Sequence, residues 1–254
     1  MLQEERFIRI RALLATLARL DTERLAQELG VSRETVRRDI MALQEQGVLR
    51  RVHGGVIAAG PEPEPPLAVR QAVRAKEKRA IARAAVRLLE AGQTLFVDAG
   101  STTTILAEEL SALAGLTIVT NGLAVAQRLA AAHPGRNEVI LLGGSVDPAL
   151  QATHGGATVA EIFRLRADAA LLSPVGVHAQ HGATSFDHRE AAVARAMAQQ
   201  AQRLIVLADH SKIGVVSRVC YAEAQRIDTL VTDAGARAVP ALADWKAAGR
   251  QVVM

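Results

Sequence analysis

The stretch "LAQELGVSRETVRRDIMALQEQGVLRRVHGG", residues 25–55, decides the architecture of the first part of this chain. A short helix is expected to end at Gly30, and Ser32 is a natural N-cap for a second helix that follows almost at once. Ala26 is small where the two helices cross and Val36 anchors the second helix, as a helix-turn-helix requires. Alternating apolar and basic residues then predict a small β-wing that ends at a glycine pair.

Exposed arginines are predicted on one face of the second helix. Val36, Ile40 and Leu43 share the inward face, so the basic residues between them project outward. Arginine forks suit phosphate oxygens and guanine edges, which makes this face a candidate DNA-reading surface. The alternative is a plain helical hairpin whose arginines are only solvated. The arginines concerned are Arg33, Arg37 and Arg38.

The same stretch resembles the N-terminal winged helix-turn-helix of the DeoR family of bacterial sugar-responsive regulators. The match runs through nearly all of it and includes the paired arginines before Asp39 and the His-Gly-Gly of the wing. Arg37 is the strongest candidate to read a base edge, while Ser32 and Thr35 are expected to position the helix on phosphate oxygens. His53 could equally be a structural turn residue. The DNA-binding set that the resemblance implies is Ser32, Arg33, Thr35, Arg37, Arg38, Arg51 and His53.

The overall composition limits the class of protein. Half of the 254 residues are apolar and 2% are aromatic, which predicts an ordered core built mainly from Ala, Leu and Val. The net charge of +4 permits nucleic-acid binding without demanding it. Cys220 is the only cysteine, which excludes an internal disulfide, and it is expected to be a small buried residue. No run reaches the roughly 18 apolar residues of a membrane span, so the sequence indicates a soluble cytoplasmic protein.

The composition changes sharply at "AAGPEPEPPLA", residues 58–68. Its prolines are incompatible with a regular helix or a central strand and favour a stiff extended spacer. We therefore predict a winged helix-turn-helix DNA-binding domain at 1–57, a Pro-rich linker at 58–68 and a larger α/β domain at 69–254.

The larger domain is predicted to be a doubly wound, mostly parallel α/β fold. A long helix is expected over about Val69–Leu89, and Ala-rich helical segments separate most of the strand-like runs that follow. Continuously apolar strands of this kind belong to a parallel sheet that is covered on both faces. The runs are "TLFVD", "LTIVT", "EVILLG", "ADAALL", "RLIVLA" and "DTLVT".

Polar residues collect where these predicted strands end. In open α/β sheets a ligand binds outside the carboxyl ends of the strands, so these residues form a candidate pocket. Gly100 allows the backbone to approach an anion, and the start of the next helix offers free N–H groups to a phosphate. Gly143 and Gly144 could instead only form a turn, and Lys212 could be only solvated. The candidate residues are Asp98, Gly100, Ser101, Thr102, Thr103, Thr104, Thr120, Asn121, Gly143, Gly144, Asp209 and Lys212.

This region also resembles the effector domain of DeoR regulators, which is similar in fold to ribose-5-phosphate isomerase. The resemblance rests on "KEKRAIARAAVRLLEAGQTLFVDAGSTTTILAEEL", "IVTNGLAVAQRL", "VILLGGSV" and "LIVLADHSKIG". It implies a phosphorylated sugar or related metabolite held by residues 101–104 and Lys212, with Asp98 and Asn121 available to its hydroxyls.

One turn departs from the family pattern. Residues 173–176 read Ser-Pro-Val-Gly, whereas many members carry a Gly-Asp-Gly-like turn there and the isomerases carry acidic residues. An isomerase needs a base beside the carbon acid of the sugar, and this turn supplies none. Asp98, Asp187 and Asp209 remain, but each is interpreted as a loop or helix cap. We therefore expect no enzymatic activity and no catalytic residue.

Three histidines lie close together in "HAQHGATSFDHRE", residues 178–190. The spacing of His178, His181 and His188 fits no compact metal-ligand motif, and Asp187 before a helical run is interpreted as an N-cap. No metal site and no cofactor are expected.

Taken together, the sequence predicts a transcriptional regulator, a repressor of sugar metabolism genes, whose affinity for operator DNA is altered by a phosphorylated sugar. A small DNA-binding module buries little surface, so a homo-oligomer, dimer or tetramer, is expected to place paired helices on repeated half-sites. Two alternatives remain open. One is an isomerase-class enzyme that acquired a DNA-binding domain, and the other is a regulator whose effector site is inactive and serves only assembly.

Overall fold

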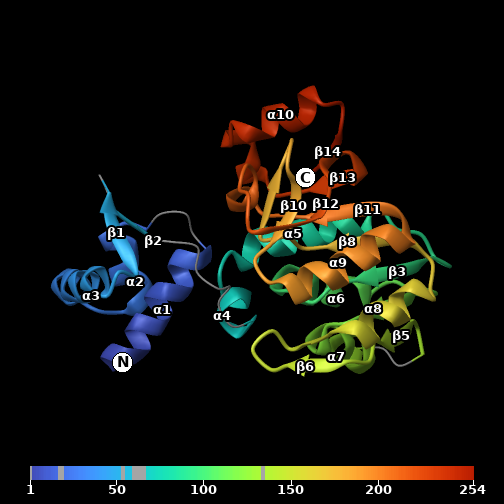
Figure 1. Cartoon of the computed structure of the whole chain (residues 1–254), viewed down its shortest axis with the longest axis horizontal. Coiled ribbons are helices and arrows are strands. Elements are labelled where there is room, and N and C mark those ends of the chain that lie inside the picture. The colour runs from blue at the N-terminus through green and yellow to red at the C-terminus, as the bar shows by residue number, and fades with distance from the viewer. Residues whose placement is uncertain (1, 17–19, 53–54, 59–66, 133–134) are drawn as a thin grey trace. The chain divides into compact units, whose positions relative to one another are not determined.

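The chain forms two compact units in a computed structural model, which describes residues 2–16, 20–52, 55–58, 67–132 and 135–254 (Figure 1). The first unit is Met1–Val73 and the second is Arg74–Met254. Most of the predicted Pro-rich linker, residues 59–66, lies outside the described residues. No helix in the described parts of the chain is long and apolar enough to cross a membrane.

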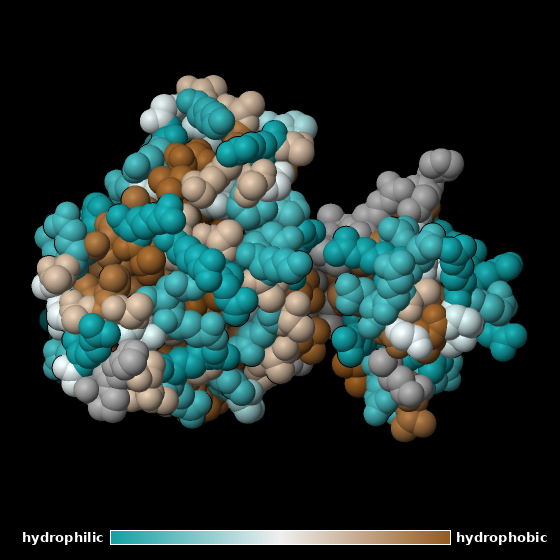
Figure 2. All heavy atoms as spheres, turned by 180° about the vertical axis from the view of Figure 1, so that it is seen from behind, coloured by the Kyte–Doolittle hydropathy of each residue, from teal (hydrophilic) through white to brown (hydrophobic). Residues whose placement is uncertain are grey.

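The first unit is a winged helix-turn-helix, as predicted. Leu25, Val36, Ile40 and Leu43 are buried in one core together with Leu49 of the wing. The two wing strands pair antiparallel. Polar residues cover much of the surface of this unit in Figure 2. Its elements are α1 (Gln3–Thr16), α2 (Thr22–Leu29), α3 (Arg33–Glu45), β1 (Leu49–Val52), β2 (Gly55–Ala58) and α4 (Leu67–Ala72).

Local capping determines where the helices of the motif begin and end. The Asp21 side chain accepts a hydrogen bond from the backbone N–H of Arg24 at 2.7 Å and caps α2. Gly30 has a φ of 63° and ends α2 in the left-handed conformation that glycine tolerates. Ser32 then caps α3 by accepting from the N–H of Thr35 at 3.1 Å. The predicted Gly30 stop and Ser32 cap are therefore confirmed.

A buried ion pair joins α1 to α3, and the sequence pattern did not reveal it. Arg6 Nε donates to Asp39 Oδ2 at 2.6 Å, and Arg6 Nη2 donates to Oδ1 at 3.0 Å. The Asp39 side chain is 1% exposed. This bidentate contact fixes the helix that carries the outward arginines against the first helix.

The second unit is built on a seven-stranded, entirely parallel sheet in the order β14-β13-β11-β8-β3-β4-β5 (Figure 1). All six predicted apolar runs are strands of this sheet. Its strands are β3 (Thr94–Val97), β4 (Thr117–Thr120), β5 (Glu138–Leu141), β8 (Ala167–Leu172), β11 (Ala201–Leu207), β13 (Thr229–Val231) and β14 (Gln251–Val253).

Helices cover both faces of the sheet, as expected for continuously apolar strands. Leu95 and Val97 of β3 pack into one core and Phe96 packs into the other, because successive side chains of a strand point to opposite faces. The helices of this unit are α5 (Ala75–Val86), α6 (Ser101–Leu110), α7 (Leu123–Ala132), α8 (Gly156–Phe163), α9 (His188–Gln200) and α10 (Ala241–Ala247).

Six short strands were not predicted, namely β14 at the edge of the main sheet and five strands outside that sheet. Strands β6 and β7 form an antiparallel pair, and β12, β10 and β9 form a three-stranded sheet. The five strands outside the main sheet lie in segments with little periodicity, and of their pairings only that of β10 with β12 joins parts that are distant in the sequence. They are β6 (Ser145–Asp147), β7 (Ala152–His154), β9 (Gly176–His178), β10 (Gly182–Ser185) and β12 (Val219–Ala222).

Two expectations were wrong. The long helix expected over Val69–Leu89 is two helices, α4 and α5, because Arg74 between them has a φ of 55° and interrupts the helical path. Cys220 is exposed instead of buried, and its thiol faces the carbonyl oxygen of His181 at 3.5 Å. It lies in a short strand whose neighbouring residue, Tyr221, takes the inward position.

The strand order shows where the chain switches from adding strands on one side of β3 to adding them on the other side. From β3 the chain adds β4 and β5 on one side, and it then crosses to β8 on the other side of β3. The strands β3 and β8 are therefore neighbours whose following loops diverge. Open α/β sheets bind ligands at such a topological switch point, outside the carboxyl ends of the strands.

Candidate functional site

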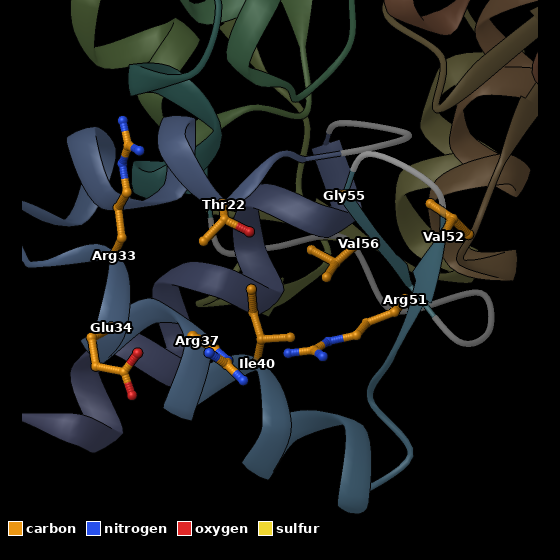
Figure 3. Close-up of a pocket in the computed structure, with 9 residues that line it drawn as sticks. All are labelled: Thr22, Arg33, Glu34, Arg37, Ile40, Arg51, Val52, Gly55 and Val56. Carbon is orange, nitrogen blue, oxygen red and sulfur yellow. The ribbon is translucent and has the colours of Figure 1, made fainter.

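The first unit carries a groove of about 510 Å³ between helix α3 and the wing (Figure 3). Ile40 and Val56 form apolar lining, while Arg37 from α3 and Arg51 from β1 both extend into the groove. Two guanidinium groups in one open groove favour an anionic partner. The complete lining is Thr22, Arg33, Glu34, Arg37, Ile40, Arg51, Val52, Gly55 and Val56.

The arginines of this surface differ in their partners. Arg33 pairs with Glu23, and Arg38 lies 3.5 Å from Glu34 one helical turn away. No carboxylate within the described residues pairs with Arg37 or Arg51. These two arginines can therefore bind phosphate or a base edge without first losing an ion pair.

The hydroxyls predicted to contact phosphate are arranged around the helix start. Ser32 Oγ and Thr35 Oγ1 are 2.9 Å apart, and Ser32 Oγ also accepts from the N–H of Thr35. Both side chains therefore stabilise the first turn of α3. His53, the remaining residue of the predicted DNA-binding set, lies outside the described residues.

In the second unit, the turns after β3 and β8 are joined at the switch point. The backbone N–H of Ser173 donates to Asp98 Oδ2 at 3.0 Å. Gly100 lies against the same turn, since a Cβ at Gly100 would stand 3.6 Å from Ser173 Cβ. The turn 173–176, singled out above because it lacks an acid, thus forms one wall of the predicted effector site.

Helix α6 begins at this junction. Its first three N–H groups, those of Ser101, Thr102 and Thr103, have no carbonyl one turn earlier in the helix to bind. The Thr102 hydroxyl is buried and finds no hydrogen-bond partner in the parts of the chain that the structure describes. These groups suit a phosphate oxygen at the positive end of the helix.

The next two hydroxyls have a different role. Thr103 Oγ1 and Thr104 Oγ1 donate to the carbonyl oxygen of Gly100 at 3.1 and 2.6 Å. Because each hydroxyl has a single proton to donate, these two side chains stabilise the helix start and keep no donor for a ligand.

Thr120 and Asn121, after β4, connect loops. Thr120 Oγ1 accepts from the N–H of Gly122 at 3.0 Å. Asn121 Oδ1 accepts from the N–H of Ala99, and its Nδ2 donates to the carbonyl oxygen of Thr153 at 2.9 Å. Asn121 therefore positions the backbone just before Gly100.

Gly143 and Gly144 support α8. The N–H of Gly143 donates to Glu161 Oε2 at 3.1 Å, and its carbonyl accepts from Thr158 Oγ1 at 2.6 Å. Gly144 has a φ of 142°, and a Cβ there would stand 2.1 Å from Thr158 Oγ1. These contacts of Gly143 and Gly144 are those of a turn that packs against α8.

Asp209 and Lys212 lie in the turn after β11, where η1 (His210–Lys212) is a short 3₁₀ helix. Lys212 Nζ donates to the carbonyl oxygen of Pro174, which places the cation beside the turn after β8. Burial raises the pKa of Asp209, but the charge of Lys212, the Ser211 hydroxyl and Arg74 outweigh it and hold this pKa below its usual value. Asp209 is therefore a carboxylate that lies beside the charges of Lys212 and Arg74.

A second cluster behind Asp209 was missed by the sequence analysis. Arg74 Nε lies 3.6 Å from Asp209 Oδ1, and Arg74 Nη1 lies 2.7 Å from His210 Nε2. Since a guanidinium can only donate, Nε2 accepts, and Nδ1 donates to Asp233 Oδ2 at 2.8 Å. This chain ties Arg74, the first residue of the second unit, to the turn that carries Lys212.

The three histidines do not form a metal site within the described residues. The rings of His178 and His181 lie 4.9 Å apart at the tip of the β9–β10 hairpin, whereas His188 begins α9. Asp187 caps α9 by accepting from the N–H groups of Arg189 and Glu190, as predicted.

Two family models match the chain. The DeoR-like helix-turn-helix domain matches residues 6–61, and the DeoR C terminal sensor domain matches residues 73–234. The HTH-type transcriptional repressor GlcR of Bacillus subtilis strain 168 is 35% identical over 234 residues, which cover 92% of this chain and 89% of that protein.

A second relative is the glycerol-3-phosphate regulon repressor of Escherichia coli K12. It is 32% identical over 234 residues, which cover 92% of each chain. Among solved structures, ribose 5-phosphate isomerase A from Methanocaldococcus jannaschii aligns with a TM-score of 0.38 at 15% identity, over 53% of this chain and 52% of that one.

Proposed function

The chain belongs to the DeoR family of transcriptional regulators, and from this premise we propose that it is a repressor whose affinity for operator DNA is controlled by a phosphorylated sugar. The observation that carries the effector class is the convergence at the switch point. Gly100, which precedes the free N–H groups of α6, and the Lys212 ammonium both lie against the turn 173–176. Helix N–H groups and an ammonium are complementary to a phosphate.

The proposed phosphate site uses fewer residues than the sequence suggested. Gly100, Ser101, Thr102 and Lys212 contact the phosphate, and Asp98 accepts from a sugar hydroxyl. The remaining predicted residues position this set through their own hydrogen bonds. They are Thr103, Thr104, Thr120, Asn121, Gly143, Gly144 and Asp209.

The proposed DNA-binding surface is the groove between α3 and the wing. Arg37 reads a base edge and Arg51 binds the backbone, while Arg33, Arg38, Ser32 and Thr35 position α3 on the phosphates. His53 is retained as a wing contact by resemblance.

We propose that the active species is a homo-oligomer that acts in the cytoplasm, where a transcription regulator meets operator DNA. One winged module contacts only one half-site, so tight operator binding calls for paired modules. Exposed apolar side chains on the second unit, which include Leu141 and Phe163, are available for contact between copies. A strictly monomeric protein that binds its operator tightly would contradict this proposal.

Isomerase activity is not proposed. The turn 173–176 has no acid, Asp98 is bonded to the Ser173 N–H, and Asp209 is held as a carboxylate by cations and a hydroxyl. The turn therefore lacks the acid that would serve as a base beside the sugar carbon. Sustained turnover of ribose 5-phosphate that Asp98→Asn abolishes would reverse this conclusion.

The decisive experiment is a thermal-shift screen of the full-length protein, followed by operator binding with and without each hit. The panel is inorganic phosphate, glycerol 3-phosphate, ribose 5-phosphate, fructose 6-phosphate and glucose 6-phosphate. A stabilising compound should also change the operator Kd. If no panel member raises Tm, the sugar-phosphate part of the proposal fails.

A further inference from the structure

Tyr221 is the only tyrosine in the chain, and it occupies an irregular position in β12. Its neighbours Cys220 and Ala222 pair with Thr184 and Ala183 of β10, and the register shifts between these two partners. Tyr221 therefore lies at a bulge, where an extra residue re-aims a side chain. The Tyr221 side chain packs in the core on one face of the main sheet and is 4% exposed.

The Tyr221 hydroxyl oxygen is buried and finds no hydrogen-bond partner among the residues that the structure describes. Buried hydroxyls almost always have such a partner, because leaving one unpaired costs free energy. A phenylalanine would fill the same apolar space without this cost. The hydroxyl thus requires an explanation that packing alone does not provide.

The surroundings of Tyr221 connect it to the switch point. Strand β12 pairs with β10, and the carbonyl of Thr184 in β10 accepts from the N–H of Val175 at 2.9 Å. Val175 belongs to the same turn as Ser173, whose N–H bonds Asp98. Burial, and next the charge of Asp98, raise the pKa of Tyr221 well above its ordinary value. The phenol is therefore a neutral donor within the field of Asp98.

We propose that the Tyr221 hydroxyl donates a hydrogen bond to an alcohol oxygen of the effector, and that Asp98 accepts the proton of the same alcohol. This inference rests on the proposed function, since it assigns a further contact in the same effector site. Tyr221 is a specificity-determining residue that distinguishes among phosphorylated compounds.

The Tyr221 donor and the Asp98 acceptor together define which functional group of the effector the site selects. An alcohol both accepts from the phenol and donates to the carboxylate, so it satisfies both groups. A carbonyl oxygen satisfies only Tyr221 and leaves Asp98 without a proton from the ligand. A deoxy position satisfies neither. The site should therefore prefer a phosphorylated polyol or sugar with an alcohol at this position over its keto or deoxy analogue.

The test compares the wild type with Tyr221→Phe in the full chain, using the panel named above. The unliganded variant should melt no lower than the wild type, because the substitution keeps the ring and removes a buried unpaired hydroxyl. Its Kd for each sugar phosphate that stabilises the wild type should rise about threefold to tenfold. Its Kd for inorganic phosphate, which lacks the sugar alcohol, should stay unchanged.

Ribose 5-phosphate and 2-deoxyribose 5-phosphate provide a matched ligand pair, as do fructose 6-phosphate and glucose 6-phosphate. Whichever pair the wild type distinguishes should be distinguished less well by Tyr221→Phe. Ligand binding should also perturb the ultraviolet absorbance of tyrosine, which reports on Tyr221 alone.

Lys212→Met separates failure of this inference from failure of the proposed function. If Lys212→Met abolishes a wild-type response that Tyr221→Phe leaves unchanged, the phosphate site stands and the Tyr221 assignment is overturned. If no panel member stabilises the wild type, both the proposed function and this inference are overturned. A Tyr221→Phe loss of affinity that extends equally to inorganic phosphate also overturns the alcohol assignment.

Discussion

The N–H of Ser173 donates a hydrogen bond to Asp98 Oδ2 at 3.0 Å, and this contact joins the two loops that diverge from the switch point of the sheet. A carboxylate that binds a backbone N–H needs no side chain from the opposing turn. The Ser-Pro-Val-Gly turn therefore positions Asp98 and Lys212, through backbone groups of Ser173 and Pro174, without contributing an acid of its own.

Arg37→Ala should weaken binding to the specific operator by about tenfold or more and relax discrimination at one base pair, because Arg37 carries the proposed base contact. Fluorescence anisotropy with specific and random duplexes measures the effect. Arg51→Ala should weaken both duplexes alike and lower the salt slope by about one. Equal losses on both duplexes for Arg37→Ala would remove the base-reading assignment. Arg50→Ala is the matched control outside the groove lining.

Asp39→Ala should destabilise the winged module by about 2–3 kcal/mol, because it removes a buried charged acceptor of two hydrogen bonds from Arg6. Urea unfolding followed by circular dichroism measures the change. Glu34→Ala removes an exposed partner of Arg38 and should change the free energy of unfolding by less than about 1 kcal/mol. Similar values for the two variants would show that the Arg6–Asp39 contact contributes little.

Lys212→Met should raise the effector Kd while leaving effector-free operator binding nearly intact, because it removes the cation proposed to bind phosphate. The operator should also change effector affinity by the same factor that the effector changes operator affinity. Isothermal titration of each ligand in the presence and absence of the other measures both factors. A Lys212→Met protein that responds to unchanged effector concentrations would place the phosphate elsewhere.

Stability should depend on the ionisation of Asp209. Its folded-state pKa lies below the ordinary value of 3.8, so its contribution is present above that value and is lost as the pH falls through the lower folded value. The Tm difference between wild type and Asp209→Asn should therefore be constant above about pH 5 and shrink in acid. Glu223→Gln, an exposed control, should show no such dependence. A difference that grows in acid would refute the sign of this shift.

Local sequence was sufficient for the winged helix-turn-helix and for all strands of the main sheet except β14. Ser32 and Gly30 define helix ends through contacts only a few residues long, so their roles can be read from neighbouring positions. The apolar runs of β3, β4, β8, β11 and β13 are buried on both faces, so these strands can be recognised without knowing which strands they pair with. The sequence could also predict a ligand pocket at the strand ends, because the carboxyl ends of parallel strands lie at the same edge of a sheet.

Which residues of the candidate site can contact a ligand, and which only position their neighbours, was decided by the tertiary structure. A threonine after β3 can offer its hydroxyl proton to a ligand only if the helix start does not use that proton. The Thr104 hydroxyl donates to the carbonyl oxygen of Gly100. Arg74 reaches His210 across 136 positions of sequence, and β8 lies beside β3 although β4 and β5 intervene in the chain. The surroundings of Tyr221 depend on the pairing of β12 with β10, which lies in a separate part of the sequence. Such contacts are decided by strand order and packing, which no local pattern of side chains encodes.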